Sequence, residues 1–266
     1  GLDVMQCLMA QAGKASIHNE EEYEAVRGEL YTDRLIDTVV ENARRLLPAQ
    51  ERGECIVRLF LDGFFWHPRD LLGIEDHLYA FYDQPDLLHR INDDLLEYEL
   101  RVLDRVLDVM RPDLVGIAED MSYNNGPMLS KACYDEFLYP YYQKLLVPLK
   151  QAGVHVFVDT DGLVTDMIPW LLNSGIEGVY PLERQAGVDL CELRREYPSL
   201  LMMGGFDKMT MSRGEDAMRR EFERLLPVMR SGGYVLSVDH QTPPEVSLDN
   251  YQIYIRLLRE YTAGDK

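Results

Sequence analysis

Six short apolar runs, separated by amphipathic stretches of helical length, are the feature that most restricts the fold of this chain. The runs are CIVRLFL (55–61), LVGIA (114–118), VHVFV (154–158), GVY (178–180), LLMMG (200–204) and YVLSV (234–238). The amphipathic stretches cover residues 85–110, 131–151, 163–174, 188–197, 214–230 and 247–262. Strands that alternate with helices pair in parallel through right-handed crossovers. The pattern therefore predicts an α/β fold built on a parallel sheet.

Helix start and stop signals support these boundaries. Pro85 stands at the start of the first amphipathic stretch, and Ser130 and Ser247 stand where N-caps are expected for two others. Gly153 and Gly175 follow predicted helices and precede strands, which is the usual place for a glycine that ends a helix.

Two architectures fit this alternation, an open doubly wound sheet and a (β/α) barrel. A doubly wound nucleotide fold usually carries a glycine-rich phosphate loop after a strand, and the sequence has none. Instead, polar side chains follow most strands: Glu119, Asp120, Asp159, Asp161, Glu183, Asp207, Asp239 and His240. In a barrel these positions share one pocket at the C-terminal mouth. Any one of them can be a helix cap, but their recurrence favours the shared pocket and the barrel.

The chain is predicted to form a single barrel domain over residues 1–266, because no long linker or low-complexity segment interrupts the alternation. Residues 1–53 have a weak pattern and are expected to be irregular or helical, with 32–47 as the best helix there; the strand–helix units occupy 54–266. A complete barrel of this type has eight strands, and only six are readable. Either residues 1–53 supply the others, or the chain is an N-terminally incomplete version of the fold.

The charge balance restricts the partners. The chain has 27 Lys and Arg against 46 Asp and Glu, a formal net charge of -19, whereas nucleic acids and anionic membranes bind basic faces. The longest apolar runs are strand-sized, so no membrane-spanning segment is expected. The four cysteines (Cys7, Cys55, Cys133 and Cys191) form no C-x-x-C pair. Together with the lack of a signal-type start, they favour reduced thiols and a cytoplasmic location.

The segment VHVFVDTDGLVTD (154–166) carries two acids, Asp159 and Asp161, directly after a strand. The D-x-D-G pattern resembles the nucleophile motif of haloacid-dehalogenase-type phosphatases, but Leu163 stands where that family has threonine, and no later metal-binding strand motif follows. An EF-hand is excluded because Gly162 falls at loop position 4, where that loop needs glycine at position 6. A structural interpretation stays open, in which Asp159 ends the strand and Asp161 caps the next helix.

Six motifs in register carry a family resemblance. They are EDMSYNNGPMLS (119–130), FLYPYYQKLLVPLKQAGV (137–154), VDTDG (158–162), GVYPLE (178–183), GGFDK (204–208) and SVDHQTPPEVSLDNY (237–251). Together they resemble the uroporphyrinogen decarboxylase superfamily over residues 55–262. The resemblance implies a TIM-type (β/α)8 barrel. It also implies one of two activities, decarboxylation of uroporphyrinogen or cobalamin-linked methyl transfer between a corrinoid protein and a thiol or other acceptor.

The methyltransferase branch is the better match. The decarboxylases carry an arginine pair and a key aspartate in an N-terminal segment upstream of anything aligned here, and an acidic chain suits a substrate with eight carboxylates poorly. The resemblance therefore implies a small-molecule substrate and a corrinoid carried by a partner protein. A homodimer also stays open. The alternatives are a decarboxylase-like enzyme and a non-catalytic barrel that binds a small molecule.

The resemblance also indicates a metal site. The related methyltransferases hold zinc through an H-x-C motif at a strand end and a later cysteine. Here Asp159 and Asp161 take the first place, and Asp239 and His240 stand in the late loop. The predicted ligands are Asp159, Asp161 and His240, a harder set that suits Zn²⁺, Fe²⁺ or Mn²⁺, with Zn²⁺ expected first. These side chains could instead form hydrogen bonds to substrate.

Further roles follow from the same resemblance. Glu119, Asp161 and His240 are the predicted catalytic residues, Glu119 as a proton carrier or a further ligand. A structural salt bridge to a barrel neighbour is the open alternative for Glu119. Asn124 and Asp207 are the predicted substrate-binding residues, although Asn124 also belongs to a turn signature, N-N-G-P. Because each strand of a barrel runs in the same direction, we expect all strand-end side chains of this set to surround one cavity.

Overall fold

The computed structural model describes residues 17–263, and within them the chain divides into two compact units. The first unit contains the residues up to 121 together with 128–156 and 170–176. The second contains residues 122–127, 157–169 and the chain from 177 onward. Cys7 and the first part of the predicted irregular region lie outside the described residues.

The main sheet contains the six strands that the sequence predicts. They are β1 (Arg58–Asp62), β2 (Leu114–Ala118), β5 (His155–Asp159), β6 (Gly178–Leu182), β7 (Leu201–Phe206) and β8 (Tyr234–Val238). Their order in the sheet is β1-β2-β5-β6-β7-β8. β1 pairs in parallel with β2, and β5, β6, β7 and β8 pair in parallel one after another. The predicted α/β fold with a parallel sheet is confirmed.

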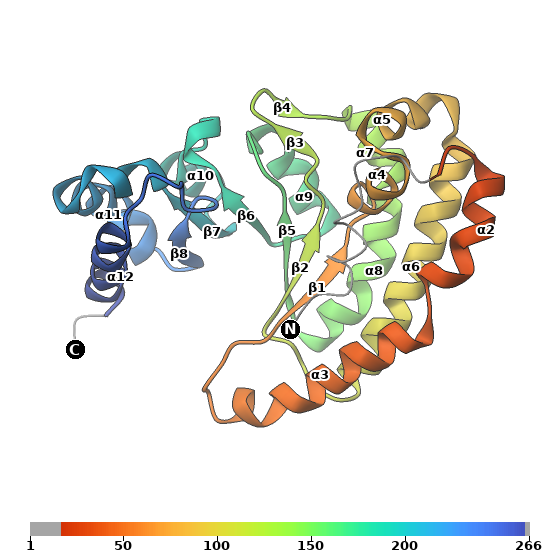
Figure 1. The fold of residues 1–266 in the computed structure, drawn as a ribbon, viewed down its shortest axis with the longest axis horizontal. Helices are drawn as coiled ribbons and strands as arrows, with labels where there is room; N and C mark the ends of the chain where they lie inside the picture. Colours follow the sequence, from red (N-terminus) through yellow and green to blue (C-terminus); the bar gives the residue numbers. More distant parts are fainter. Residues whose placement is uncertain (1–16, 264–266) are drawn as a thin grey trace. The chain divides into compact units, whose positions relative to one another are not determined.

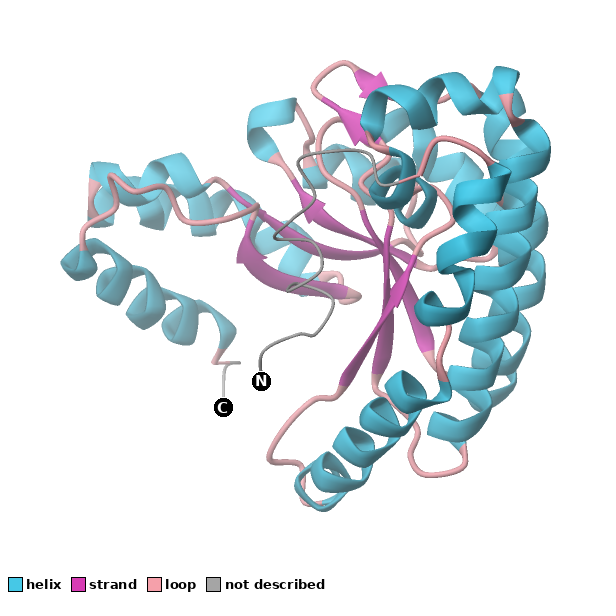
Figure 2. Cartoon of the chain, turned by 45° about the vertical axis from the view of Figure 1, so that its right-hand side comes forward, coloured by secondary structure: helices cyan, strands magenta, loops and turns pink. Residues whose placement is uncertain are grey.

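The first unit is rich in helices (Figures 1 and 2). They are α2 (Glu20–Leu30), α3 (Asp33–Glu51), α4 (Trp66–Leu72), α5 (Ile74–Asp83), α6 (Pro85–Leu107), α7 (Lys131–Phe137) and α8 (Tyr139–Ala152). α6 lies beside α8 and also contacts α3. α6 buries Leu88, Ile91 and Leu95, which recur at helical spacing and place one apolar face in the core.

The second unit contains the last three residues of β5, the whole of β6, β7 and β8, and the loops that follow these strands. It contains the hairpin of β3 (Ser122–Tyr123) and β4 (Gly126–Pro127), the helices α10 (Leu190–Glu196), α11 (Glu215–Arg230) and α12 (Leu248–Thr262), and the 3-10 turns η2 (Arg184–Ala186) and η3 (Lys208–Arg213). η1 (Thr165–Met167) leads into α9 (Ile168–Ser174). Its core includes Phe206, Phe222 and Tyr254, whose ring centroids lie 4.6–5.8 Å apart. These rings attach α11 and α12 to β7.

The predicted helix caps are confirmed. The hydroxyl oxygen of Ser130 accepts a hydrogen bond from the Cys133 N–H at 3.1 Å, and that of Ser247 accepts one from the Asn250 N–H at 3.2 Å. Gly153 ends α8 in the left-handed conformation with φ 67°. These local signals were readable because a cap depends on only a few neighbouring residues.

Two helix predictions need correction. The stretch 131–151, predicted as one helix, is two helices that meet at Leu138. Pro140 causes the break, because proline lacks an N–H and restricts the residue before it.

The second correction concerns α4 and α5, which were not predicted. Pro68 lies in the first turn of α4, where a missing N–H is tolerated. No helix within residues 17–263 is long and apolar enough to cross a membrane.

Candidate functional site

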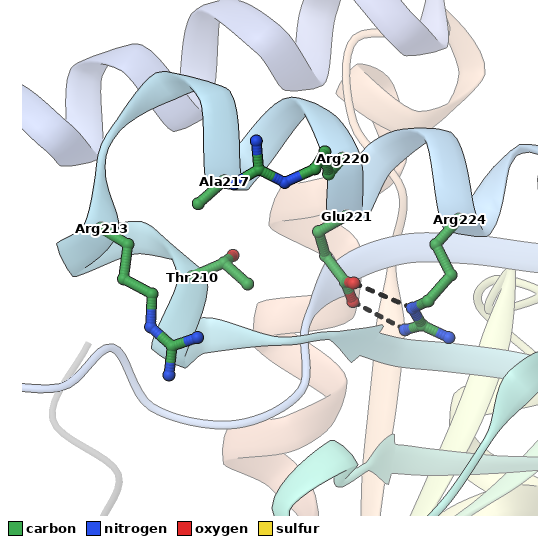
Figure 3. A pocket seen from close by; sticks show the side chains of 6 residues that line it. All are labelled: Thr210, Arg213, Ala217, Arg220, Glu221 and Arg224. Carbon is green, nitrogen blue, oxygen red and sulfur yellow. Dashed lines mark hydrogen bonds and ion pairs between the residues drawn. The ribbon is translucent and has the colours of Figure 1, made fainter.

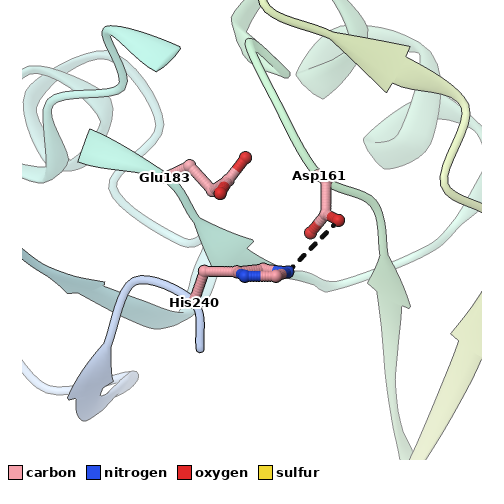
Figure 4. Close-up of side chains that lie close together, drawn as sticks. All are labelled: Asp161, Glu183 and His240. Carbon is pink, nitrogen blue, oxygen red and sulfur yellow. Dashed lines mark ion pairs between the residues drawn. The ribbon is translucent and has the colours of Figure 1, made fainter. Parts of the chain in front are cut away.

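Three side chains from three strand ends come together in the second unit (Figure 4). Asp161 follows β5, Glu183 follows β6 and His240 follows β8. One ligand atom from each lies within 4.8 Å of the others. The Nε2 atom of His240 is 3.3 Å from Oδ2 of Asp161, and these two side chains are 33% and 39% exposed. A substrate can therefore reach this cluster, called here the Asp161 cluster.

The loop after β5 directs Asp161 toward His240. The preceding residue, Thr160, is fully buried; its N–H donates to the carbonyl oxygen of Tyr180 at 2.9 Å, and its hydroxyl lies 3.2 Å from the hydroxyl of Ser122. The Ser122 hydroxyl also donates to the carbonyl oxygen of Asp161. These bonds fix the backbone on both sides of the Asp161 side chain. The N-cap of the following η1 is Val164, with no side-chain cap bond, so the structure does not use Asp161 as its N-cap.

Gly162 closes this loop, and only glycine fits there. Its φ is +80°, and a Cβ atom would lie 2.6–2.7 Å from backbone atoms of Tyr123. The hairpin approaches this closely because the Leu163 N–H donates to the carbonyl oxygen of Tyr123 at 2.9 Å. The Gly162 N–H donates to Oε2 of Glu183 at 2.8 Å. The glycine therefore both permits the turn and holds one member of the Asp161 cluster.

Substitution of Gly162 by alanine is expected to lower the free energy of unfolding by at least about 2 kcal/mol, because it adds backbone strain and a steric clash. Chemical denaturation followed by circular dichroism measures this. Gly28→Ala is the control, since Gly28 lies inside α2 and nothing is within 4 Å of an added Cβ. The control is expected to be neutral or stabilising by up to about 1 kcal/mol. Equal stability of the two variants would contradict the structure of this loop.

Lys208 adds a positive charge beside the cluster, and the sequence did not identify it. Its Nζ atom lies 3.4 Å from Oε1 of Glu183 and 3.7 Å from Oδ1 of Asp239. The side chain is only 13% exposed. An ammonium this well shielded interacts with nearby carboxylates more strongly than a surface lysine does. Lys208 is therefore part of the electrostatic environment of the site.

Asp239 connects three strand ends. It is fully buried, and its two carboxylate oxygens accept the backbone N–H of Arg184 at 3.0 Å and that of Lys208 at 3.2 Å. Burial raises the pKa of Asp239, and the nearby Lys208 ammonium and these two N–H groups act in the opposite direction. Through these bonds Asp239 positions the loops after β6 and β7, next to its neighbour His240.

An ion pair on α11 holds the end of β7 and the residue that follows it (Figure 3). Arg224 and Glu221 form two hydrogen bonds of 2.6 and 2.8 Å. Oε1 of Glu221 accepts the Asp207 N–H at 3.0 Å, and Arg224 donates to the Gly205 carbonyl oxygen at 3.3 Å. The adjoining pocket, about 350 Å³, is lined by Thr210, Arg213, Ala217, Arg220, Glu221 and Arg224. The pair thus holds the backbone that leads to Lys208.

The two predicted substrate-binding residues, Asp207 and Asn124, stand at a cap and in a turn of the fold. Oδ1 of Asp207 accepts the Met209 N–H at 2.9 Å and a Gln185 amide N–H at 2.7 Å, so Asp207 caps η3. Asn124 is exposed in the turn between β3 and β4, as the N-N-G-P signature indicates. Neither side chain belongs to the Asp161 cluster, and a role in substrate binding stays a prediction for both.

The structure pairs Asp161 with His240, as predicted, but their third partner is Glu183. Asp159 ends β5 and is not among the three residues whose ligand atoms converge. Its role as a ligand stays a prediction. Glu183 had a readable signal, because it follows β6 in GVYPLE just as Asp161 follows β5. For Lys208, the only signal in the sequence was its place in the GGFDK motif.

Glu119, the remaining predicted catalytic residue, is buried in the first unit. Its carboxylate accepts the backbone N–H groups of residues 64, 65 and 66 at 3.0, 2.7 and 3.2 Å, and also the hydroxyl of Tyr142. Gly63 allows this approach, since a Cβ there would be 2.1 Å from the Glu119 carboxyl carbon. Burial raises the pKa of Glu119 to about 7, and its hydrogen bonds act against this rise. In this setting Glu119 anchors the start of α4.

The donor set of the Asp161 cluster fits a divalent metal ion. Zinc binds histidine nitrogen and carboxylate oxygen at about 2.0–2.2 Å, which separates two tetrahedral ligands by about 3.4 Å. The 3.3 Å between His240 Nε2 and Asp161 Oδ2 matches that separation. No cysteine belongs to the cluster among residues 17–263. A site with one imidazole and two carboxylates suits borderline and hard cations and leaves coordination positions for substrate.

Comparison with known families identifies the group to which this protein is related. The family model described as uroporphyrinogen decarboxylase (URO-D) matches residues 17–261. The chain belongs to the uroporphyrinogen decarboxylase family. The curated uroporphyrinogen decarboxylase of Hydrogenobaculum sp. (strain Y04AAS1) is 20% identical over 198 residues, which cover 71% of this chain and 52% of that protein. The chain thus spans about half the length of this relative.

A solved structure shows the same fold. The methyltransferase from Methanosarcina mazei superposes with a TM-score of 0.63 at 16% identity, covering 89% of this chain and 69% of that chain. At this identity the likeness concerns the fold. It agrees with the TIM-type fold predicted from the motifs, and the predicted superfamily is confirmed by the family match.

Proposed function

We propose that this member of the uroporphyrinogen decarboxylase family is a methyltransferase related to the corrinoid-linked enzymes. In this proposal it moves a methyl group between a corrinoid carried by a partner protein and a small acceptor. The observation that supports it most is the convergence of Asp161, Glu183 and His240 at the C-terminal ends of three parallel strands. This is the edge where barrel enzymes carry out their chemistry.

The three residues of the cluster would share the binding of one metal ion. Asp161, Glu183 and His240 would hold a divalent ion, with zinc as the first candidate, and such an ion supplies Lewis-acid activation of an acceptor at neutral pH. Before an ion binds, Asp161 orients the His240 ring through the 3.3 Å contact. The Gly162 N–H holds the Glu183 carboxylate in place at 2.8 Å. The partly exposed Asp161 and His240 leave the acceptor a route to the site.

The direct test is methyl transfer from methylcobalamin. The zinc-loaded protein is mixed with methylcobalamin and a panel of thiol, amine and hydroxyl acceptors, and loss of the methyl–cobalt absorbance is followed in the visible range. We expect demethylation that depends on both protein and one class of acceptor. Absence of demethylation with every acceptor, including trials with a methylated corrinoid protein as donor, would reject the proposal.

A decarboxylase is the second candidate, because the curated relative carries that name. The same preparation is incubated with uroporphyrinogen, and coproporphyrinogen is sought by fluorescence after oxidation. We expect no product, since the Asp161 cluster presents carboxylates to a substrate that is itself rich in carboxylates. Product formation would favour the decarboxylase. Failure of both reactions, with a small molecule retained on the protein, would favour a binding role.

A further inference from the structure

The ammonium group of Lys208 lies 3.4 Å from the Glu183 carboxylate, so a metal ion bound to Glu183 would lie close to a second positive charge. We propose that Lys208 is the internal counter-cation of the Asp161 cluster. In this proposal its ammonium neutralises Glu183 in the metal-free site, moves toward Asp239 when a divalent ion binds, and thereby sets the affinity for that ion. The inference uses the metal-binding part of the proposed function and does not depend on methyl transfer.

The position of the ammonium supports this role. Its Nζ atom lies between two carboxylates, 3.4 Å from Glu183 and 3.7 Å from Asp239. Both distances exceed the roughly 2.7–2.9 Å of a tight charge-assisted hydrogen bond. The ammonium is therefore shared between the two acids and can approach either with a small side-chain rotation.

The surrounding bonds restrict this movement to the side chain. The Lys208 N–H donates to Asp239, and the preceding residue, Asp207, is held by Glu221. Asp239 is buried and already in contact with the lysine, so it can accept the displaced ammonium without exposing a new charge. Lysine suits this task because its charge is compact and its four-carbon stem is flexible.

The charge balance also fits. Asp161, Glu183 and Asp239 provide three carboxylates against the one ammonium of Lys208, a formal charge of -2 when His240 is neutral. One divalent ion cancels this charge. Without Lys208 the same groups would carry one more negative charge and attract the ion more strongly. The lysine is thus expected to weaken metal binding while keeping the metal-free site stable.

Competition titration of Zn²⁺ against a chromogenic chelator tests the inference. Lys208→Met is expected to bind Zn²⁺ at least about 10-fold more tightly than the parent, an effect of the size seen for groups next to metal ligands. Lys208→Arg, which keeps the charge, is expected to stay near the parent. Lys144→Met is the matched control, because it removes an exposed lysine on α8 and changes the net charge equally. Equal or weaker zinc binding by Lys208→Met would overturn the proposal.

A second variant covers the case in which Lys208→Met does not fold, as judged by thermal unfolding. Asp239→Asn leaves the ammonium with Glu183 alone, so zinc binding is expected to weaken several-fold, and an unchanged or tighter affinity contradicts the inference. Failure of the parent and all variants to bind zinc overturns it as well. Zinc affinities that respond as expected in a protein that does not demethylate methylcobalamin would reject only the proposed methyl transfer.

Discussion

Asp161→Asn is expected to lower zinc affinity, and any methyl transfer, by at least about 10-fold. The substitution keeps the shape of the side chain but removes the negative charge that faces His240 Nε2 at 3.3 Å. An amide oxygen is also a weaker ligand for zinc than a carboxylate, and its nitrogen is no ligand at all. Titration with a chromogenic chelator measures the affinity, and the absorbance of methylcobalamin measures the transfer.

Asp159→Asn is the matched control for this variant. It makes the same chemical change two residues earlier, at the end of β5 and outside the three converging residues. If the metal site consists of the three converging residues, the change is less than about threefold, well below the effect of losing a group that supports the metal; if Asp159 is a ligand as the sequence predicts, the loss is about 10-fold or more. A large loss in Asp159→Asn with none in Asp161→Asn would assign the ligand to Asp159. If neither variant changes zinc binding, the cluster is not a metal site.

At pH 4.5, where Glu119 contributes most, Glu119→Gln is expected to lower the free energy of unfolding by about 3 kcal/mol, the size of effect known for breaking a buried hydrogen-bond network. The Glu119 carboxylate accepts three backbone N–H groups and the Tyr142 hydroxyl. A glutamine amide has only one acceptor oxygen, and its NH2 group would face backbone N–H groups that also need an acceptor. Urea denaturation measures the loss.

Glu97→Gln provides the comparison, because Glu97 is exposed on α6 of the same unit. That variant is expected to stay within about 0.5 kcal/mol of the parent. A Glu119→Gln protein as stable as the parent but unable to transfer methyl groups would show that Glu119 takes part in the chemistry. A loss of stability with normal turnover per folded molecule would establish the anchoring role.

The pKa of Glu119 also predicts a dependence on pH. Burial raises its pKa from the ordinary 4.5 to about 7, so between these values the folded state binds a proton that the unfolded state has released. Stability therefore falls as pH rises through this window. The contribution of Glu119 is complete below the lower value and is lost above the upper one. The stability difference between the parent and Glu119→Gln should accordingly shrink from pH 4.5 to pH 7, as measured by urea denaturation in a pH series.

Local signals in the sequence were sufficient for most of the secondary structure. The strands LVGIA and YVLSV have the predicted boundaries, and α11 and α12 begin within one residue of theirs. Strands and helices can be recognised from the spacing of apolar residues along the chain. The caps at Ser130 and Ser247 depend only on residues close by in the sequence. Pro140 is a local signal for the break between α7 and α8, and the prediction of one helix over 131–151 did not use it.

The site was predictable in part for a topological reason. Asp161 and His240 each follow a strand, and parallel strands bring their C-terminal ends to one edge, so residues far apart in sequence could be expected to meet. Glu183 has the same position after β6 and completes the cluster. The strand-end rule thus indicated which side chains lie close together, and their functional roles stay predictions.

What a strand-end side chain does was decided by the tertiary structure. Asp161 and Asp207 both follow strands, yet Asp161 faces His240 while Asp207 caps η3. The difference comes from partners elsewhere in the chain: the Ser122 hydroxyl fixes the loop of Asp161, and Glu221 holds the backbone of Asp207. The sequence by itself determined which residues reach the edge of the sheet, because the direction of the strands follows from their alternation with helices. Only the folded chain decided where their carboxylates point, because that depends on hydrogen bonds from distant segments, whose pairing no local pattern specifies.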